Sequence, residues 1–171
     1  IRHTDSVPET HVAVPLCNTQ SVLVASPAYL REQGRPEIPA ELETHACLHY
    51  PRPGEVPTWS FSRLTKDRHG NAPQAVVRIR SALTVNNSEA LRDAALAGLG
   101  IALIPDFTAQ AALLRGDLVP VLTDWEFTGR MFARQIYAVR PYAVHAPLAV
   151  RALLVFLREA LRGGFPLKPA I

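Results

Sequence analysis

The stretch NNSEALRDAALAGLGIALIP, residues 86–105, most constrains the fold of this chain. Small and apolar residues in its first half recur at the spacing of one buried helix face: Leu91, Ala94, Ala95 and Gly98. Gly98 and Gly100 then end the helix, because glycine adopts positive φ angles without steric cost. The apolar run 101–104 that follows is typical of a strand covered on both faces.

A polar trio, Asn86, Asn87 and Ser88, precedes this helix. The segment 78–85 before it is strand-like, with β-branched residues, so the sequence predicts a strand–helix–strand unit. Either asparagine can cap the helix, and a cap at Asn86 puts Glu89 at the third helical position of a capping box. The trio also stands where open α/β sheets bind ligands, since free N–H groups and the helix dipole favour anions. Capping alone and ligand binding both fit these residues.

Helical and extended segments alternate along the rest of the chain. Helices are expected at 27–33, 39–43, 107–114 and after Pro147, and strands at 11–16, 21–25, 47–50, 59–64, 76–85, 118–122 and 135–140. Residues 124–134 are expected to be irregular. The pattern predicts an α/β protein with a mostly parallel sheet and one antiparallel hairpin, formed by 59–64 and 76–85.

The composition fits a folded protein of one domain or two small lobes. The 171 residues are 48% apolar and 19% charged, with a formal net charge of +3. The densest basic region is Arg63, Lys66, Arg68, Arg78 and Arg80, which indicates a solvated hairpin face rather than a phosphate-binding track. The longest apolar run, 94–105, is too short to cross a bilayer, so no membrane partner is expected.

The sequence contains few candidates for covalent or metal chemistry. Cys17 and Cys47 are far apart and indicate buried thiols in a reducing compartment. His45, Cys47 and His49 alternate and would share one face of a strand, which could suit zinc. No fourth ligand is nearby in sequence, and GxSxG, Walker and HExxH motifs are absent. We therefore expect no metal, no cofactor and no enzyme activity.

Taken in order, several segments resemble the effector-binding domain of LysR-type transcriptional regulators. The segments are VLVASPAYL (22–30), IPAELETHACLHY (38–50), the Trp59/Phe61 pair, NNSEALRDAALAGLGIALIPDF (86–107), GDLVPVL (116–122) and QIYAVRP (135–141). No single segment is distinctive, but the ordered set spans nearly the whole chain.

The resemblance implies an α/β, periplasmic-binding-protein-like (type 2) fold of two lobes. On that basis, residues 1–11 and 135–162 are part of the first lobe, 12–21 and 123–134 are the crossings between lobes, 22–122 are the second lobe, and 163–171 are a tail. The first lobe would then be incomplete in this chain, and the family's DNA-binding winged helix-turn-helix would be missing.

The resemblance also implies a function. The domain would bind a small anionic or polar effector between its lobes and signal to the missing DNA-binding domain, in the cytoplasm. The residues at matching positions are Arg2, Ser26, Pro27, Thr84, Asn86, Asn87 and Ser88. The intact protein would be a homodimer or homotetramer, with an interface that includes Glu89, Arg92, Asp93 and Leu96, where Leu96 is expected on the solvated helix face. A solute-binding protein of the same fold class is the alternative.

Overall fold

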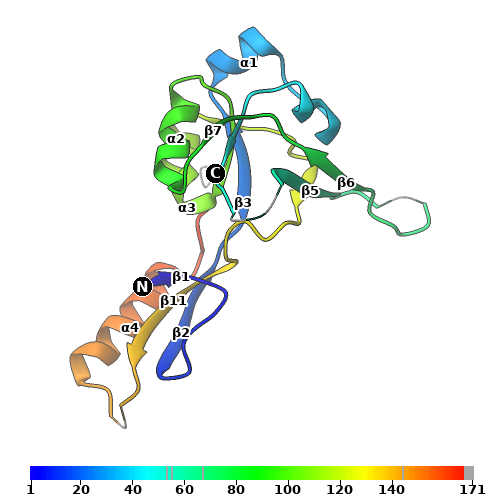
Figure 1. Ribbon diagram of the computed structural model, residues 1–171. Coiled ribbons are helices and arrows are strands. Elements are labelled where there is room, and N and C mark those ends of the chain that lie inside the picture. Colours follow the sequence, from blue (N-terminus) through cyan, green and yellow to red (C-terminus); the bar gives the residue numbers. More distant parts are fainter. Residues whose placement is uncertain (53, 55, 67, 144, 168–171) are drawn as a thin grey trace.

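The computed structural model describes residues 1–52, 54, 56–66, 68–143 and 145–167, and Figure 1 shows them as two joined bodies. The large body contains β3 (Ser21–Ala25), α1 (Pro27–Gln33), the 3-10 turn η1 (Pro39–Glu43), β4 (Cys47–His49), β5 (Thr58–Arg63), β6 (Gln74–Arg78), β7 (Ser81–Thr84), α2 (Ser88–Leu96), β8 (Ile101–Pro105), α3 (Asp106–Arg115), β9 (Val119–Pro120) and β10 (Trp125–Phe127). The small body contains β1 (Arg2–His3), β2 (His11–Asn18), β11 (Gln135–Pro141) and α4 (Leu148–Ala160).

The large body is built on a five-stranded sheet with the order β7-β4-β8-β3-β9. Helices α2 and α3 cover one face, where Ala102 and Ile104 pack with buried Leu91. A second sheet, β10-β5-β6, covers the other face, where Ile101 and Leu103 pack with its buried aromatic side chains. Because successive residues of a strand point to opposite faces, β8 is buried along its whole length, as its apolar run predicts.

The predicted strand–helix–strand unit is confirmed as β7–α2–β8. Strand β4 lies between the two strands and is parallel to both. Gly98 follows the helix with a φ of 78°, in the left-handed region that glycine tolerates. At Gly100 a Cβ atom would lie 2.3 Å from the carbonyl oxygen of Ala46, so no other residue fits without a backbone shift. The two glycines therefore let the chain turn from α2 into the centre of the sheet.

The prediction of mostly parallel sheets is wrong. Among the strand pairs of the described residues, only β4–β7 and β4–β8 run parallel, and the other pairs are antiparallel. The expected single strand 76–85 is also divided, since β6 joins the hairpin sheet and β7 joins the central sheet. Segment 124–134, expected to be irregular, contributes β10 as the partner of β5. The expected hairpin itself is confirmed by the antiparallel β5–β6 pair.

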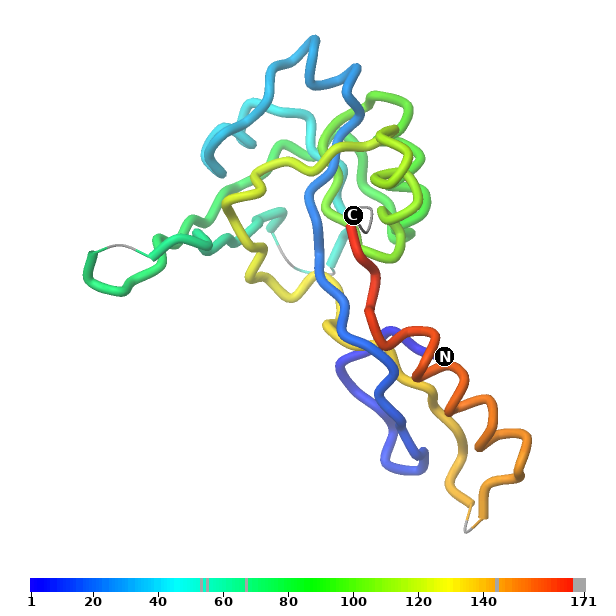
Figure 2. The backbone as a smooth tube through the Cα atoms, turned by 180° about the vertical axis from the view of Figure 1, so that it is seen from behind, coloured from blue at the N-terminus to red at the C-terminus, as the bar shows by residue number. Residues whose placement is uncertain are grey.

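The small body is an antiparallel sheet, β1-β11-β2, with α4 beside it (Figure 1). Figure 2 shows three stretches of chain joining the two bodies, after β2, before β11 and after α4. Two of them are tied together, since Thr19 N–H donates to the carbonyl oxygen of Arg134 at 2.9 Å. The third returns to the large body, where Phe165 packs against Phe107. No helix in the described ranges has the length and apolar character needed to cross a membrane.

Candidate functional site

A pocket of about 410 Å³ lies where the two bodies meet. Its lining comes from β1, from the stretch before β11 and from the ends of β4, β8, α2 and α3: His3, Tyr50, Asn86, Asn87, Ser88, Glu89, Arg92, Pro105, Phe107, Thr108 and Phe132. The parallel strands β7 and β8 lead into α2 and α3 at this edge of the sheet, which is the position where α/β proteins bind ligands. The structure thus brings the predicted polar trio to one wall of a pocket.

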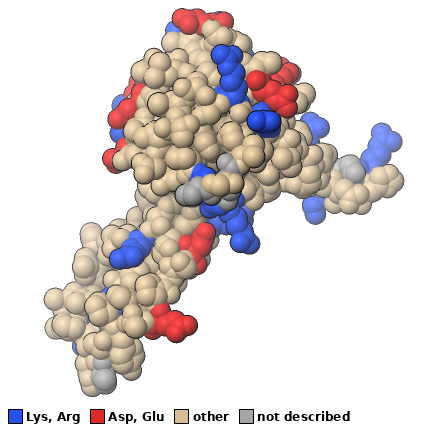
Figure 3. Space-filling view, viewed as in Figure 1, with Lys and Arg blue, Asp and Glu red and all other residues tan. Residues whose placement is uncertain are grey.

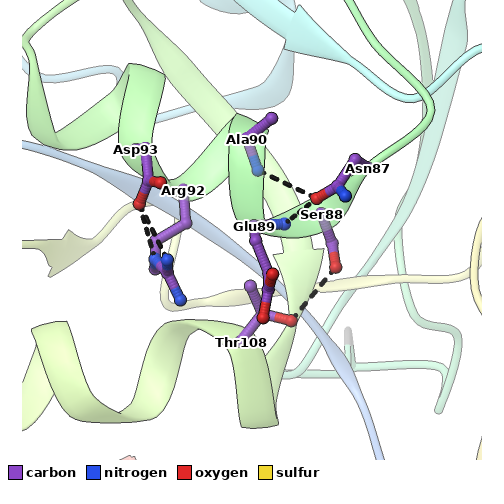
Figure 4. Close-up of polar contacts among 7 residues, drawn as sticks. All are labelled: Asn87, Ser88, Glu89, Ala90, Arg92, Asp93 and Thr108. Atoms are coloured by element: carbon purple, nitrogen blue, oxygen red, sulfur yellow. Dashed lines mark hydrogen bonds and ion pairs between the residues drawn. The ribbon is translucent and has the colours of Figure 1, made fainter.

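Asn87 is the residue that caps α2 (Figure 4). It has extended backbone angles, and its Oδ1 atom accepts bonds from Glu89 N at 2.8 Å and Ala90 N at 3.0 Å. Asn86 is therefore outside the helix, and the capping box with Glu89 that an Asn86 cap would form is not made. Leu91 N–H donates to the Asn87 carbonyl at 3.1 Å. Since the cap satisfies two of the four N–H groups that a helix start leaves without intrahelical acceptors, this helix end attracts an anion less than an uncapped one.

Ser88 connects α2 to α3 and stands beside the pocket. Its hydroxyl oxygen lies 3.2 Å from the hydroxyl oxygen of Thr108, and either group can donate (Figure 4). Both hydroxyls belong to the pocket lining, and each has a lone pair left for a ligand.

Arg92 also lines the pocket, and its guanidinium forms an ion pair at 2.8 Å with Asp93. A ligand's negative charge would compete with Asp93 for this cation.

His3 forms the opposite side and holds the joining stretches together. Its Nε2 atom lies 2.6 Å from the carbonyl oxygen of Ala133 and 3.0 Å from the hydroxyl oxygen of Thr19. A carbonyl oxygen only accepts, so Nε2 carries a proton, and the Thr19 hydroxyl donates to the same carbonyl at 3.1 Å. The imidazole also packs edge-to-face on Phe107, with 5.0 Å between ring centroids. From β1, the His3 side chain thus contacts both of these joining stretches and α3.

Aromatic rings complete the lining. Tyr50, which follows β4, packs edge-to-face on Phe132, with 5.0 Å between centroids. Phe107, at the start of α3, contributes a third ring to the pocket. Together with the hydroxyl and amide groups of α2 and α3, these rings form a small pocket of mixed character. Such a pocket suits a small molecule with one flat apolar part and a few polar atoms.

The remaining predicted ligand residues do not line this pocket. Ser26 is buried and caps α1, its hydroxyl accepting from Tyr29 N at 3.2 Å, and Pro27 begins that helix. The hydroxyl of Thr84 lies 2.8 Å from that of Ser81. Arg2 is exposed on β1, opposite Tyr137 of β11. Only the trio 86–88 of the predicted set meets at the pocket.

Sequence reasoning missed several pocket residues, namely His3, Tyr50, Phe107, Thr108 and Phe132. Phe107 and Thr108 follow the carboxyl end of β8, as the trio follows β7, so the same rule would have found them. His3 and Phe132 come from segments with no distinctive pattern. Their place depends on how the two bodies meet, which local sequence does not encode.

A second hollow, of about 930 Å³, also lies at the junction. It is larger than the first, but its lining includes none of the predicted ligand residues and takes in the tail after α4: residues 15–20, Asp106, Gln135 and 162–167. Asp106 is buried there, and burial raises the pKa of its carboxyl group, while bonds from Gln20 N and Phe107 N oppose the shift. The Asp106 carboxylate is engaged by these backbone bonds, and no predicted ligand residue lines this hollow. We therefore place the candidate site in the smaller pocket.

The His45–Cys47–His49 segment does not have the character of a zinc site. The Nδ1 atom of His45 lies 3.0 Å from the hydroxyl oxygen of Tyr29, and burial lowers the pKa of this imidazole. Burial raises the pKa of the Cys47 thiol to about 12, so the thiolate that zinc needs is strongly disfavoured. Across the part of the chain that the structure describes, no three metal-ligating side chains gather.

Comparison with known proteins gives the family. The LysR substrate binding domain family matches residues 1–162. The chain is 30% identical over 164 residues to the probable HTH-type transcriptional regulator LtrA of Klebsiella pneumoniae, covering 94% of this chain and 50% of LtrA. It is 34% identical over 151 residues to the HTH-type transcriptional regulator PtxR of Pseudomonas aeruginosa, covering 87% of this chain and 44% of PtxR. The chain spans about half the length of these relatives.

Solved structures agree. The regulatory domain of CrgA, a LysR-type transcriptional regulator from Neisseria meningitidis, superposes with a TM-score of 0.68 at 29% identity, covering 90% of this chain and 70% of that domain. Full-length AphB, a virulence activator of Vibrio cholerae, gives 0.68 at 27% identity, covering 91% of this chain and 49% of AphB. These neighbours confirm the periplasmic-binding-protein-like α/β fold. The chain belongs to the LysR substrate-binding domain family.

Proposed function

We propose that this chain is the effector-sensing part of a LysR-type transcriptional regulator. A small polar or anionic metabolite would bind between the two bodies, and a helix-turn-helix domain elsewhere in the protein would carry the response to DNA. The observation that supports this most is the position of the pocket at the junction of the two bodies. His3 lines the pocket and also bonds to the stretches that join the bodies. The related proteins are HTH-type regulators, which favours this role over that of a solute-binding protein.

Ligand binding at this pocket would influence how the bodies are arranged. His3 holds the crossing stretches through Thr19 and Ala133 while its ring faces the pocket. A ligand that contacts both His3 and α2 would stabilise the arrangement in which those contacts are made. A ligand shifts such an equilibrium only by its difference in affinity for the two states. Contacts to both bodies provide that difference, whereas contacts to α2 alone would not.

The lining indicates which ligand groups would be recognised. The Asn86 amide and the hydroxyls of Ser88 and Thr108 can donate to a carboxylate or accept from a hydroxyl group. The Nε2 proton of His3 is already donated to Ala133, so Nδ1 is the ring atom that a ligand would meet. The rings of Phe107 and Phe132 would cover the apolar part of the ligand. The proposed role is binding, with no catalytic step.

Location and assembly are part of the same proposal. A regulator of this kind would act in the cytoplasm of a bacterium, where its DNA is, as a homodimer or homotetramer. The proposed lobe boundaries are those given above, with crossings at 12–21 and 123–134.

The proposed interface includes Glu89, Arg92, Asp93 and Leu96 on α2. Leu96 is half-buried against the core under α2, which corrects its expected place on the solvated face, so the exposed part of this surface is mainly acidic.

Effector titration of the full-length regulator tests the proposal. A panel of small carboxylic acids and polar metabolites is first screened by thermal shift, and the best ligand is titrated by calorimetry. Asn86→Leu should weaken its binding by about 1–3 kcal/mol, the usual cost of one lost buried polar contact. Asn71→Leu, the same change on the distant β5–β6 hairpin, is the control. Unchanged affinity in a folded Asn86→Leu protein would contradict this site.

A further inference from the structure

The wall of the pocket that α2 forms carries one charge of each sign. Glu89 and Arg92 both line the pocket and are three residues apart on the helix. Side chains at this spacing are neighbours on one helix face, with about 5–6 Å between their Cβ atoms. In Figure 4 both side chains point from α2 toward α3. Figure 3 shows acidic and basic side chains next to each other at the left edge of the large body, where α2 lies.

These two charges are not paired with each other. The Arg92 guanidinium bonds to Asp93 instead, with Nε at 2.9 Å and Nη2 at 2.8 Å from the same carboxylate oxygen. Adjacent helix residues do not face each other and Asp93 is exposed, so this ion pair is weak. Within the part of the chain that the structure describes, the Glu89 carboxylate has no ion pair and no hydrogen bond. A ligand carboxylate can therefore displace Asp93, and Glu89 is left for a cation.

A ligand with a single charge gains one of these contacts and meets a repulsion at the other. A simple carboxylate bound to Arg92 would lie near Glu89, which has the same charge, and an amine bound to Glu89 would lie near Arg92. A ligand with an ammonium group and a carboxylate on one carbon atom gives each of the two side chains an opposite charge. α-Amino acids have this arrangement.

The rest of the lining suits a flat apolar side chain. Tyr50 and Phe132 pack edge-to-face at the pocket, and Phe107 adds a third ring. Aromatic rings pack well against such surfaces. The hydroxyls of Ser88 and of buried Thr108 can accept from an ammonium group or donate to a carboxylate. The volume of about 410 Å³ is in the range of pockets that bind small molecules.

We propose that the ligand of this pocket is an aromatic α-amino acid, with its carboxylate on Arg92 and its ammonium group on Glu89. This inference rests on the proposed function, because it names the class of effector that the pocket would sense. It ranks a zwitterion above a plain carboxylic acid of the same shape. Glu89 and Arg92 are then the residues that determine the specificity of the site.

Ligand truncation in the full-length regulator tests the two contacts. Phenylalanine, tyrosine and tryptophan are titrated by calorimetry, and the tightest of them is compared with two analogues that each lack one charge. For phenylalanine, phenylpropanoate lacks the ammonium group and phenethylamine lacks the carboxylate. The amino acid should bind at least about tenfold tighter than either analogue, because each analogue loses a charge-assisted contact. The proposal is overturned if none of the three amino acids binds, or if an analogue binds as tightly.

Two variants assign the contacts to their residues. Glu89→Gln should lower the preference over the analogue without the ammonium group about tenfold, and Arg92→Gln should do the same for the analogue without the carboxylate. Each readout is a ratio of two affinities in one protein. A change in helix stability, or in assembly through the proposed α2 interface, affects both affinities alike and leaves the ratio unchanged. Glu32→Gln and Arg31→Gln, the same changes at exposed residues of α1, are the controls.

The result also separates this inference from the proposed function. If both variants keep the ratios of the parent, the assignment of Glu89 and Arg92 is wrong. A ligand whose binding depends on Asn86 but on neither charged residue would overturn the zwitterion while supporting the site. If no ligand depends on Asn86, the site itself is contradicted and the inference falls with it.

Discussion

Asp106 and Gln20 hold each other through a reciprocal pair of hydrogen bonds. Gln20 N donates to the Asp106 carboxylate oxygen Oδ2 at 3.0 Å, and Asp106 N donates to the Gln20 carbonyl at 2.9 Å. The other carboxylate oxygen accepts from Phe107 N at 2.8 Å. These bonds fix the start of α3 to the stretch that follows β2. The wall of the pocket that carries Phe107 is thereby attached to the junction of the two bodies.

The first prediction concerns this pair. Asp106→Ala should lower the free energy of unfolding by about 1–3 kcal/mol, because it leaves two backbone N–H groups without their charged acceptor. Denaturant unfolding measures the change. Asp117→Ala removes an exposed carboxylate near the other end of α3 and should cost far less. Equal losses in the two variants would show that the Asp106 bonds contribute little.

The sequence predicts the central unit of the fold because its signals are local. The helical spacing in residues 88–96, the glycines that follow and the apolar run of β8 each depend on neighbours within a few residues. The helix bounds 27–33 and the 3-10 turn at 39–43 are confirmed for the same reason, since prolines mark their starts. Topology alone also predicts that the polar trio lies at the edge of the sheet, where the structure has a pocket.

What the sequence does not predict depends on long-range pairing. Residues 76–85 form one strand-like run, but the chain leaves one sheet at Arg78 and enters another at Ser81. Local sequence does not give strand direction either: β3 is apolar like β8, which runs parallel to β4, and yet β3 runs antiparallel to β8. His3 became part of the site only because β1 pairs with β11, more than 130 residues later. No local pattern carries that information.

The second prediction concerns Gly100. A Cβ atom there would meet the Ala46 carbonyl oxygen at 2.3 Å, and the φ of 157° is strained for any other residue. Gly100→Ala should therefore lower the free energy of unfolding by about 1–3 kcal/mol. Gly163→Ala is the matched control, because its Cβ would have open space around it. Thermal melts of both variants measure the loss of stability. A Gly100→Ala protein as stable as the Gly163→Ala control would contradict the prediction.

The third prediction is a pH dependence from His45. The Tyr29 hydroxyl accepts from Ala46 N at 3.0 Å and can donate its own proton to His45 Nδ1, which fits a neutral imidazole. Burial lowers the pKa of this group from its usual 6.5, and Glu41 opposes the shift. The unfolded chain therefore takes up a proton near pH 6.5 that the folded chain resists. Stability is present above that pH and is lost as the pH falls toward the lower folded pKa.

Denaturant unfolding at about pH 7.5 and about pH 5.5 measures this loss. The parent and His45→Asn differ only at this residue, so the comparison is the pH-dependent loss in the parent against that in the variant. Asparagine keeps a side-chain acceptor near the Tyr29 hydroxyl but does not titrate. The loss should be smaller in the variant. An identical loss in parent and variant would assign the pH dependence to other groups.

The fourth prediction separates the two asparagines before α2. Asn87→Ala removes the cap that accepts from Glu89 N and Ala90 N, and should cost about 1 kcal/mol of stability. Asn86→Ala leaves the cap intact and should change stability little while weakening effector binding. Thermal melts and effector titration of the two variants distinguish the roles. A larger stability loss for Asn86→Ala would reverse the assignment.

The last prediction concerns the proposed α2 interface in a longer protein with both lobes. Leu96 packs against the core, so its replacement by a charge would disturb folding as well as assembly. The Asp93 side chain is 63% exposed and makes an ion pair with its neighbour Arg92. Asp93→Arg therefore reverses a charge on the proposed contact surface without changing the core, and a two-fold dimer would contain the change twice.

Sedimentation should show dimerisation at least about tenfold weaker, while Asp124→Arg, an exposed control away from α2, should leave it unchanged. If Asp93→Arg dimerises as tightly as the parent, this face of α2 lies outside the interface.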